Sequence, residues 1–192
     1  MILCKEDYRM YLEQDMKANW RSSAKPKLFG DEQWKFILTL RKLEYYRSKH
    51  GFEKIIFLIP TAIVKFFNHR YAVSCGYTIN AGQCGKGLAL PHRGYVVMNS
   101  NAVIGDNCRI HQGVTIGSTG GSDASAKIGN NVFIGAGASI IGDIEIADDV
   151  SIGANAVVTK SINEAGTTWG GVPAVKISDK NSHSNLSPYL FK

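Results

Sequence analysis

The feature that most constrains this chain of 192 residues is an aliphatic side chain that recurs every six residues through its middle region. A small or β-branched residue lies two positions before each member. Neither an α-helix, with a period of 3.6, nor a single strand, with a period of two, sustains this spacing. A short strand followed by a turn does so, and three such units make one coil of a prism with an aliphatic core. The series is Ile104, Ile110, Ile116, Ile128, Ile134, Ile140, Ile146, Ile152 and Val158.

The series predicts a mainly β protein with a parallel β-helix at its centre. We expect about five coils over residues 75–176. An α-helical segment over residues 1–74 precedes them, and a loosely attached C-terminal tail over residues 177–192 follows. Residues 118–126 (STGGSDASA) interrupt the repeat without shifting its phase, so this polar, glycine-rich stretch is predicted to project from the prism as a loop.

The first 74 residues carry helical rather than strand periodicity. Apolar side chains recur at helical spacing over residues 8–16. A second helix is expected to begin near Asp31, a candidate N-cap, and to end at Gly51. A third is expected from Phe52 onward, bent or broken at Pro60 because proline removes a helical hydrogen bond.

Composition and charge narrow the class of protein. The formal net charge is +6, from 22 basic and 16 acidic residues. The basic residues are scattered and no aromatic nucleic-acid motif accompanies them, so no nucleic-acid partner is expected. The four cysteines show no metal-ligand spacing and fit free thiols in a reducing compartment. Charged residues soon after Met1 do not fit a signal peptide, and we expect a cytoplasmic protein.

One segment, Ile55–Phe67 (IIFLIPTAIVKFF), is strongly apolar. It is shorter than the ~20 residues that a membrane-spanning helix needs, and it contains Pro60 and Lys65. It therefore indicates a buried or interfacial helix. Peripheral contact with the inner face of a membrane remains an open alternative.

The repeat, the segment Leu90–Gly117 (LPHRGYVVMNSNAVIGDNCRIHQGVTIG) and the GGVPA sequence at residues 170–174 resemble the hexapeptide-repeat acyltransferases. Within that superfamily the chain is similar to serine acetyltransferases and to O-acetyltransferases of surface-polysaccharide synthesis. The resemblance implies a left-handed β-helix, a homotrimer, acetyl-CoA as cosubstrate and no metal. It also implies that His92 is the catalytic base. An imidazole is suited to this task because it can remove the proton of a poorly nucleophilic hydroxyl as attack proceeds.

The resemblance also assigns the acetyl-CoA site, residue by residue. Ala136 and Ala154 match positions whose backbone meets the cofactor. Thr159 and Lys160 match a pair in galactoside acetyltransferases, where the lysine suits a phosphate of CoA. Lys176 is a weaker candidate for a phosphate contact, because Val175 separates it from the GGVPA sequence.

Two further residues are candidates for substrate binding. His111 lies 19 positions after His92, so we expect it one coil away, where it can orient the acceptor or remain an ordinary surface residue. Ser125 takes the place of a histidine that serine acetyltransferases carry in the projecting loop. Those enzymes also have an aspartate immediately before the catalytic histidine, where this chain has Pro91. No carboxylate lies one coil upstream, near Tyr77.

These departures bear on the acceptor. An amino acid needs charged partners, because an unpaired buried amine is costly, whereas a sugar hydroxyl needs only hydrogen bonds and a base. The sequence therefore favours a sugar of a capsule, O-antigen or exopolysaccharide as acceptor, with serine O-acetylation as the alternative. Two other classes share the fold. A γ-type carbonic anhydrase needs three histidine ligands, and the repeat region has only His92 and His111. A purely structural β-helix scaffold has no need of the LPH and GGVPA sequences.

Overall fold

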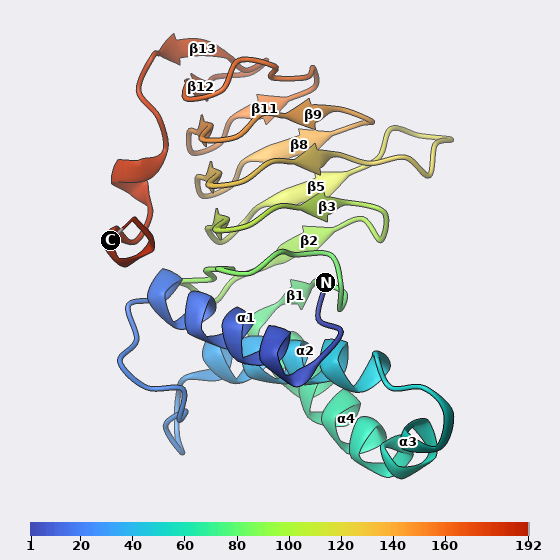
Figure 1. Ribbon diagram of the computed structural model, residues 1–192. Helices are drawn as coiled ribbons and strands as arrows, with labels where there is room; N and C mark the ends of the chain where they lie inside the picture. Colours follow the sequence, from blue (N-terminus) through green and yellow to red (C-terminus); the bar gives the residue numbers. More distant parts are fainter. Residues whose placement is uncertain (192) are drawn as a thin grey trace.

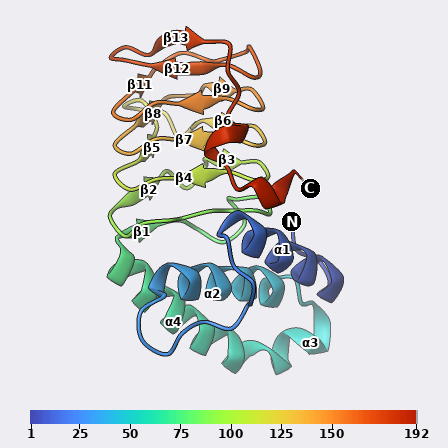
Figure 2. The ribbon, with the colours of Figure 1, turned by 90° about the vertical axis from the view of Figure 1, so that its left-hand side faces the viewer.

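Helices form one end of the molecule and short strands wind away from them, as the computed structural model shows for residues 1–191 (Figure 1). The described N-terminal part contains α1 (Lys5–Ala18), α2 (Glu32–Arg47), α3 (Gly51–Ile56) and α4 (Leu58–Cys75). Figure 2 shows α1 and α2 stacked between the first coil and α4. The segment predicted to be helical is thus helical, and the coil begins directly after α4.

Two local expectations for this segment are wrong, and a third holds for the position of the helix start but not for its capping bond. The second helix ends at Arg47, and Gly51 begins α3 instead of ending α2. Asp31 occupies the N-cap position of α2, but its carboxylate binds Arg21 and the backbone N–H of Lys27 instead of the helix. The chain breaks between α3 and α4 at Phe57, not at Pro60. Pro60 lies in the first turn of α4, where its missing N–H would have no helical partner.

In residues 1–191, thirteen short strands form three sheets, which are the three faces of a prism. We name the faces after a central strand. The β5 face has the order β1-β2-β5-β8-β11, the β7 face β13-β12-β10-β7-β4 and the β6 face β3-β6-β9. The strands are β1 (Tyr77–Thr78), β2 (Val96–Met98), β3 (Val103–Ile104), β4 (Arg109–Ile110), β5 (Thr115–Gly117), β6 (Lys127–Ile128), β7 (Phe133–Ile134), β8 (Ser139–Ile141), β9 (Glu145–Ile146), β10 (Ser151–Ile152), β11 (Val157–Val158), β12 (Thr168–Gly170) and β13 (Val175–Ser178).

All pairings between these strands are parallel except that of β12 with β13, which is antiparallel and ends the prism. The chain therefore forms a left-handed parallel β-helix, and the predicted fold class is confirmed. Thr115 pairs with Ser139, 24 positions along the chain, whereas Ser139 pairs with Val157, 18 positions further. The six additional residues of the first offset belong to the polar loop, which projects from the prism in yellow (Figure 1).

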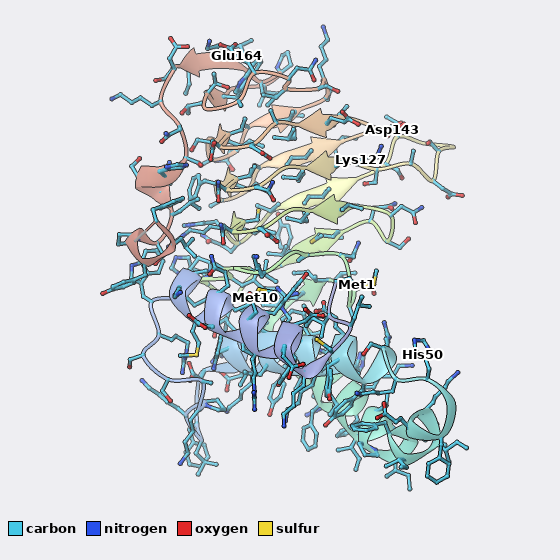
Figure 3. The ribbon with its side chains drawn as sticks, viewed as in Figure 1. Met1, Met10, His50, Lys127, Asp143 and Glu164 are labelled. Atoms are coloured by element: carbon cyan, nitrogen blue, oxygen red, sulfur yellow. The ribbon has the colours of Figure 1, made fainter. Side chains whose placement is uncertain are left out.

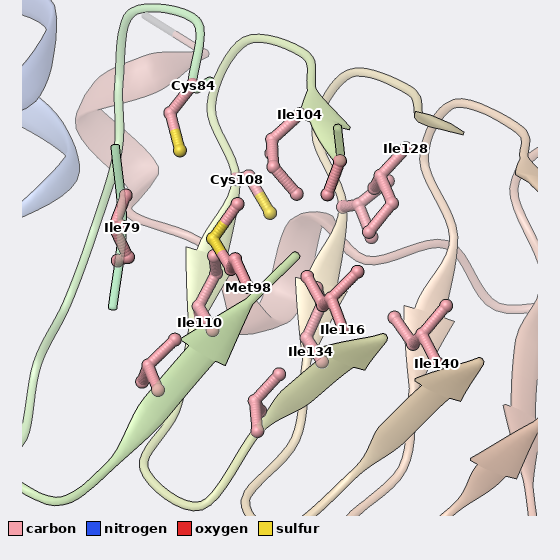
Figure 4. Close-up of a cluster of buried hydrophobic side chains, with 14 of the residues drawn as sticks. Ile79, Cys84, Met98, Ile104, Cys108, Ile110, Ile116, Ile128, Ile134 and Ile140 are labelled. Atoms are coloured by element: carbon pink, nitrogen blue, oxygen red, sulfur yellow. The ribbon is translucent and has the colours of Figure 1, made fainter. Parts of the chain in front are cut away.

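The six-residue series forms the core. All of its members are at most 4% exposed. Paired residues stack directly upon one another from coil to coil, as Ile110 does on Ile134 and Ile116 on Ile140. Figure 4 shows these columns of isoleucine, with Cys84 and Cys108 pointing into the same interior. Glycine follows Ile104 because a Cβ at position 105 would lie 2.6 Å from a backbone oxygen of the next coil.

A buried charge network joins the helical end to the first coil. The fully buried guanidinium of Arg41 binds Asp15 and Glu44 and donates to the backbone oxygens of Cys84 and Gly85. The Asp15 carboxylate also accepts the N–H groups of residues 87 and 88. Burial disfavours the charge of Arg41, but the two carboxylates outweigh it and hold the pKa of Arg41 above its ordinary value.

A second network runs up the prism edge between the β6 and β7 faces. Asn107 donates to Asn131 at 2.8 Å, and Asn131 donates to Asp149 at 2.9 Å. All three residues have positive φ, which asparagine and aspartate tolerate at a turn. Gln14 of α1 binds the lower end of this ladder, and His183 of the C-terminal segment binds the upper end. The ladder thus ties both ends of the chain to one edge.

The C-terminal segment is not loosely attached, contrary to expectation. Leu186 is buried, and the Ser187 hydroxyl donates to the backbone oxygen of Lys17 in α1 at 2.6 Å. The ring of His183 stacks on Phe191 at 4.1 Å. The segment returns along the prism to the helical end, where it meets the C-terminal end of α1 (Figures 1 and 2).

Candidate active site

The exposed side chain of His92 lies at a corner of the first coil, where the chain passes from the β7 face to the β5 face. This corner is longer than the one above it. Eight residue steps separate Ala89 from Val97, whereas six separate their partners in the next coil, Arg109 and Thr115. The two additional residues let the backbone bulge away from the core at His92.

Tyr77 holds this bulge in place. Its hydroxyl donates to the backbone oxygen of His92 at 2.5 Å, and its ring packs edge-on against Phe36 of α2 at 5.2 Å. Burial raises the pKa of Tyr77, so the phenol stays protonated and remains a donor. The coil before His92 therefore supplies a phenol, which fixes the backbone of His92. The resemblance implies a carboxylate at this place in serine acetyltransferases.

His111 lies one coil above His92, and the two ring centroids are 5.4 Å apart in an edge-to-face arrangement. The Nε of Arg109 donates to Nε2 of His111 at 3.2 Å, so the proton of the neutral imidazole must lie on Nδ1. Phe133 covers the other side of the ring at 5.1 Å. Burial and the charges of Arg109 and His92 lower the pKa of His111. A neutral, fixed imidazole thus flanks the exposed one.

Arg109 and the chain between α1 and α2 border a pocket of about 230 Å³ next to Pro91. The guanidinium of Arg109 stacks on the ring of Trp20 at 4.3 Å. Trp34 and the paired Arg21 and Asp31 also line this pocket. A larger hollow of about 520 Å³ lies between α2, α4 and the first coil, and His92 is not among its lining residues.

Two acidic side chains close to the His92 corner are already paired. Asp31 forms a bidentate ion pair with Arg21, and Glu32 pairs with Arg93, the residue after His92. No ion pair with a carboxylate is found for His92 or His111 in the described part of the chain. The surroundings of the two imidazoles therefore carry positive charge, from Arg109, rather than a free carboxylate.

Ala136 and Ala154 lie on the same prism edge as His92, in later coils. The backbone N–H of Gly113 bonds the oxygen of Tyr95, that of Gly137 bonds Gln112, and that of Asn155 bonds Ala136. These bonds stack the four corners in register. At the strand spacing of about 4.8 Å, the edge from His92 to Ala154 spans roughly 14 Å. Small side chains leave the backbone of this edge open to a ligand.

The two lysines differ in their surroundings. Lys160 and Thr159 are exposed at the next edge, between the β5 and β6 faces, and no ion pair of Lys160 is found among residues 1–191. Lys176 binds Asp179 at 2.6 Å and Glu164 at 2.5 Å, and these carboxylates raise its pKa. Its charge is thus neutralised at the far end of the prism, where Glu164 is labelled in Figure 3. That Lys176 binds a CoA phosphate stays a prediction, and it would require Lys176 to leave these two carboxylates.

Ser125 does not project with the loop. It is 3% exposed at the base of the loop, where the chain rejoins the prism, and its hydroxyl has no hydrogen-bond partner among the described residues. The adjacent Ala126 is fully buried in the core. That Ser125 binds substrate stays a prediction; in the single chain its side chain is buried where the loop returns to the prism.

Sequence reasoning missed Tyr77, Arg109 and Trp20. Tyr77 lies one coil before the His92 corner, and the spacing of the repeat is sufficient to predict this position. Trp20 reaches Arg109 only through the path of the chain between α1 and α2, for which the repeat gives no signal. In residues 1–191 there is no cluster of three metal-binding side chains, and no helix long and apolar enough to cross a membrane.

Comparison with known proteins agrees with this architecture. Residues 125–160 match the family described as bacterial transferase hexapeptide (six repeats). The match lies within the three parallel sheets, so hexapeptide repeats agree with the coils observed in this part of the chain.

Among proteins of known kind, the chain is similar to serine acetyltransferases. Serine acetyltransferase 1, chloroplastic, of Arabidopsis thaliana is 40% identical over 73 residues, which are 36% of this chain and 23% of that protein. The matched segment is thus about a quarter of the curated relative. The crystal structure of serine acetyltransferase from Brucella abortus has a TM-score of 0.71 at 26% identity, covering 93% of this chain and 72% of that one. A structure of the Brucella abortus enzyme in complex with coenzyme A has a TM-score of 0.68 at 28% identity, covering 92% and 70%.

Proposed function

We propose that this chain transfers an acetyl group from acetyl-CoA to a hydroxyl acceptor, with His92 as the base. The observation that carries the proposal is the exposed imidazole at a lengthened corner, on the same open edge as Ala136 and Ala154. The relatives support it, because they are serine acetyltransferases and one of them was crystallised with coenzyme A.

The chemistry assigned to His92 is general base catalysis. Acetyl-CoA supplies the acetyl group as an activated thioester. The neutral imidazole of His92 accepts the acceptor's O–H proton as that oxygen forms its bond to the acetyl carbon. After the thioester bond breaks, the imidazolium of His92 returns the proton to the departing sulfur. Such proton transfer contributes about 10²–10⁴-fold to the rate.

His111 is proposed as a positioning residue for this base. Arg109 fixes the tautomer of His111, and Phe133 restricts its ring. Its edge-to-face contact then limits the orientations open to the His92 ring. A neutral neighbour also avoids the repulsion that a second imidazolium would impose when His92 takes up a proton.

The residues present fit CoA in part. The open backbone of the Ala136–Ala154 edge suits an extended pantetheine arm. Lys160 has no ion pair among residues 1–191, so its charge suits a phosphate, with Thr159 beside it. Lys176 is not assigned, because two carboxylates already bind it. His92 and Lys160 lie on different edges of the prism, so a second copy is proposed to close the groove between them, within a homotrimer.

Two acceptors are considered. The relatives favour serine, since each of those described above is a serine acetyltransferase. The residues favour an uncharged acceptor, such as a sugar hydroxyl. Asp31 and Glu32 are already paired with arginines, so neither carboxylate is free to bind the amine of serine, and Arg109 adds positive charge. Serine is the first candidate by similarity, and a saccharide hydroxyl is the second by site chemistry.

The test is release of the CoA thiol by the purified chain with acetyl-CoA and a panel of serine, sugar nucleotides and oligosaccharides. His92→Ala is expected to lower turnover by about 10²-fold or more while leaving the affinity for acetyl-CoA nearly unchanged. His50→Ala, at the junction of α2 and α3, serves as the matched control. Thiol release at the wild-type rate by His92→Ala would contradict the assignment of the base. Serine turnover without sugar turnover would exclude the saccharide acceptor.

A further inference from the structure

Arg109 is a partly buried cation without a carboxylate partner among residues 1–191. Its Nη1 is shielded from solvent and has no hydrogen-bond partner within the same part of the chain. Burial lowers the pKa of Arg109 below its ordinary value, as expected for a cation that no nearby carboxylate stabilises. Arg41, by contrast, is fully buried but binds two carboxylates. A buried charge without a partner is costly, so Arg109 is suited to an anion from outside the described chain.

Trp20 contacts the guanidinium of Arg109 from a backbone position that tryptophan rarely occupies. α1 ends with the N–H of Arg21 bonded to the backbone oxygen of Met16 at 2.9 Å, and this turn gives Trp20 a φ of 51°. Glycine usually takes this position, because a Cβ is disfavoured in left-handed backbone. The amide of Asn19 anchors the turn to a backbone oxygen of the first coil at 2.8 Å. The ring of Trp20 is thus held 4.3 Å from the guanidinium despite a conformational cost.

The pocket of about 230 Å³ that Arg109 borders has a net positive charge. Among the described residues, Asp31 is the acid that lines this pocket, and a bidentate ion pair with Arg21 neutralises it. The charge that remains is that of Arg109, and the amide of Gln33 adds a further polar group to the lining. Aromatic walls with a few polar groups are typical of sites for small molecules, and the charge here favours one with an anionic group.

This pocket lies beside the proposed base. Pro91, which lines the pocket, directly precedes His92 in the chain. The ring of His111 lies between Arg109 and His92, since it accepts from the Nε of Arg109 at 3.2 Å and contacts His92 at 5.4 Å between centroids. One small molecule can therefore place one group against Arg109 and present another to His92.

We propose that this pocket binds an anionic group, a carboxylate or a phosphate, of the hydroxyl acceptor, and that Arg109 selects it. The proposal rests on the acetyl transfer proposed above and deepens it. Because Nε of Arg109 is engaged by His111, the Nη1 end of its fork is left for an anion. The hydroxyl that reacts at His92 is itself uncharged. An acidic sugar or a sugar phosphate meets both conditions, whereas the positive charge of the pocket disfavours an amine.

The test is equilibrium binding of matched sugars to the full chain, measured by NMR without acetyl-CoA. The pairs are glucose with glucuronate, galactose with galacturonate, and glucose with glucose 6-phosphate. In at least one pair the wild type is expected to bind the acidic member about tenfold more tightly than the neutral one. This preference should decrease at high salt. The uronates and the phosphate distinguish a carboxylate site from a phosphate site.

Four variants separate binding from other roles of these residues. Arg109→Met keeps an apolar stem beside Trp20 and is expected to abolish the preference for the acid, whereas Arg109→Lys keeps the charge and should retain part of it. Arg70→Met, which removes an exposed arginine of α4, is the matched control and should leave the preference unchanged. His92→Ala should also keep it, so a failure of the acetyl-transfer mechanism would not alter this measurement.

Two results would overturn the proposal. The first is equal binding, or no binding, of the acidic and neutral members in all three pairs. The second is an Arg109→Met protein with the wild-type preference. If that variant also lowers turnover with every acceptor alike, Arg109 acts through His111 alone. A wild-type protein that prefers the acids but acetylates none of the acceptors would locate the error in the proposed function instead of the pocket.

Discussion

Replacing Arg41 with methionine tests how the helical end is attached to the prism. The guanidinium makes six hydrogen bonds, to Asp15, Glu44 and the backbone oxygens of Cys84 and Gly85. Arg41→Met keeps much of the volume but leaves the buried carboxylates of Asp15 and Glu44 without a cation. Breaking a buried pair from one side costs about 3–5 kcal/mol. We expect this loss in the free energy of unfolding.

Urea unfolding followed by circular dichroism, at one fixed protein concentration, measures the loss. With an m-value of about 2 kcal/mol/M, the midpoint should fall by roughly 2 M. The triple variant Arg41→Met, Asp15→Asn, Glu44→Gln is the control, because its amides still accept the N–H groups of the first coil without a buried charge. It should recover much of the loss. A decrease below about 1 kcal/mol for Arg41→Met, or a triple variant no more stable than the single one, would refute the reasoning.

Three further predictions follow from the site and the core. Because the pKa of His111 is lowered from 6.5 in the folded chain, the unfolded chain binds the proton first on acidification. The free energy of unfolding of the wild type should therefore decrease as the pH falls below 6.5, and that of His111→Gln should decrease less. Urea unfolding from pH 8 to pH 5 measures both proteins, and an equal decrease in the two would contradict the prediction. Lys160→Ala should raise the KM for acetyl-CoA several-fold with little change in kcat, and an unchanged KM would remove it from the site. Of the four thiols, only that of the exposed Cys4 should react rapidly with a disulfide reagent. Burial raises the pKa of the other three thiols, to about 12 for Cys84. Fast reaction of two or more thiols per native chain would contradict the buried placement.

Much of the prism was predictable because its repeat is local. The aliphatic side chain at every sixth position indicates which side chains point into the prism. The unchanged phase of the repeat across the polar loop indicates how the strands before and after the loop pair. The neighbourhood of His92 and His111 follows from the same period, since residues about one coil apart must stack. The same period places Tyr77 one coil below His92, but it does not specify the bond from the Tyr77 hydroxyl to the His92 backbone, which depends on the path of the lengthened corner.

The sequence by itself thus determined the β-helix, the corner that bears His92 and the edge that bears Ala136 and Ala154. Only the tertiary structure decided which side chains are free to bind a ligand. Lys176 meets two carboxylates, and Ser125 turns into the base of its loop. Ile59, Ile63 and Phe66 of α4 stay exposed in the part of the chain that the structure describes. A repeat fixes contacts at a constant offset along the chain, whereas charge pairing and burial depend on which distant segments arrive beside a residue.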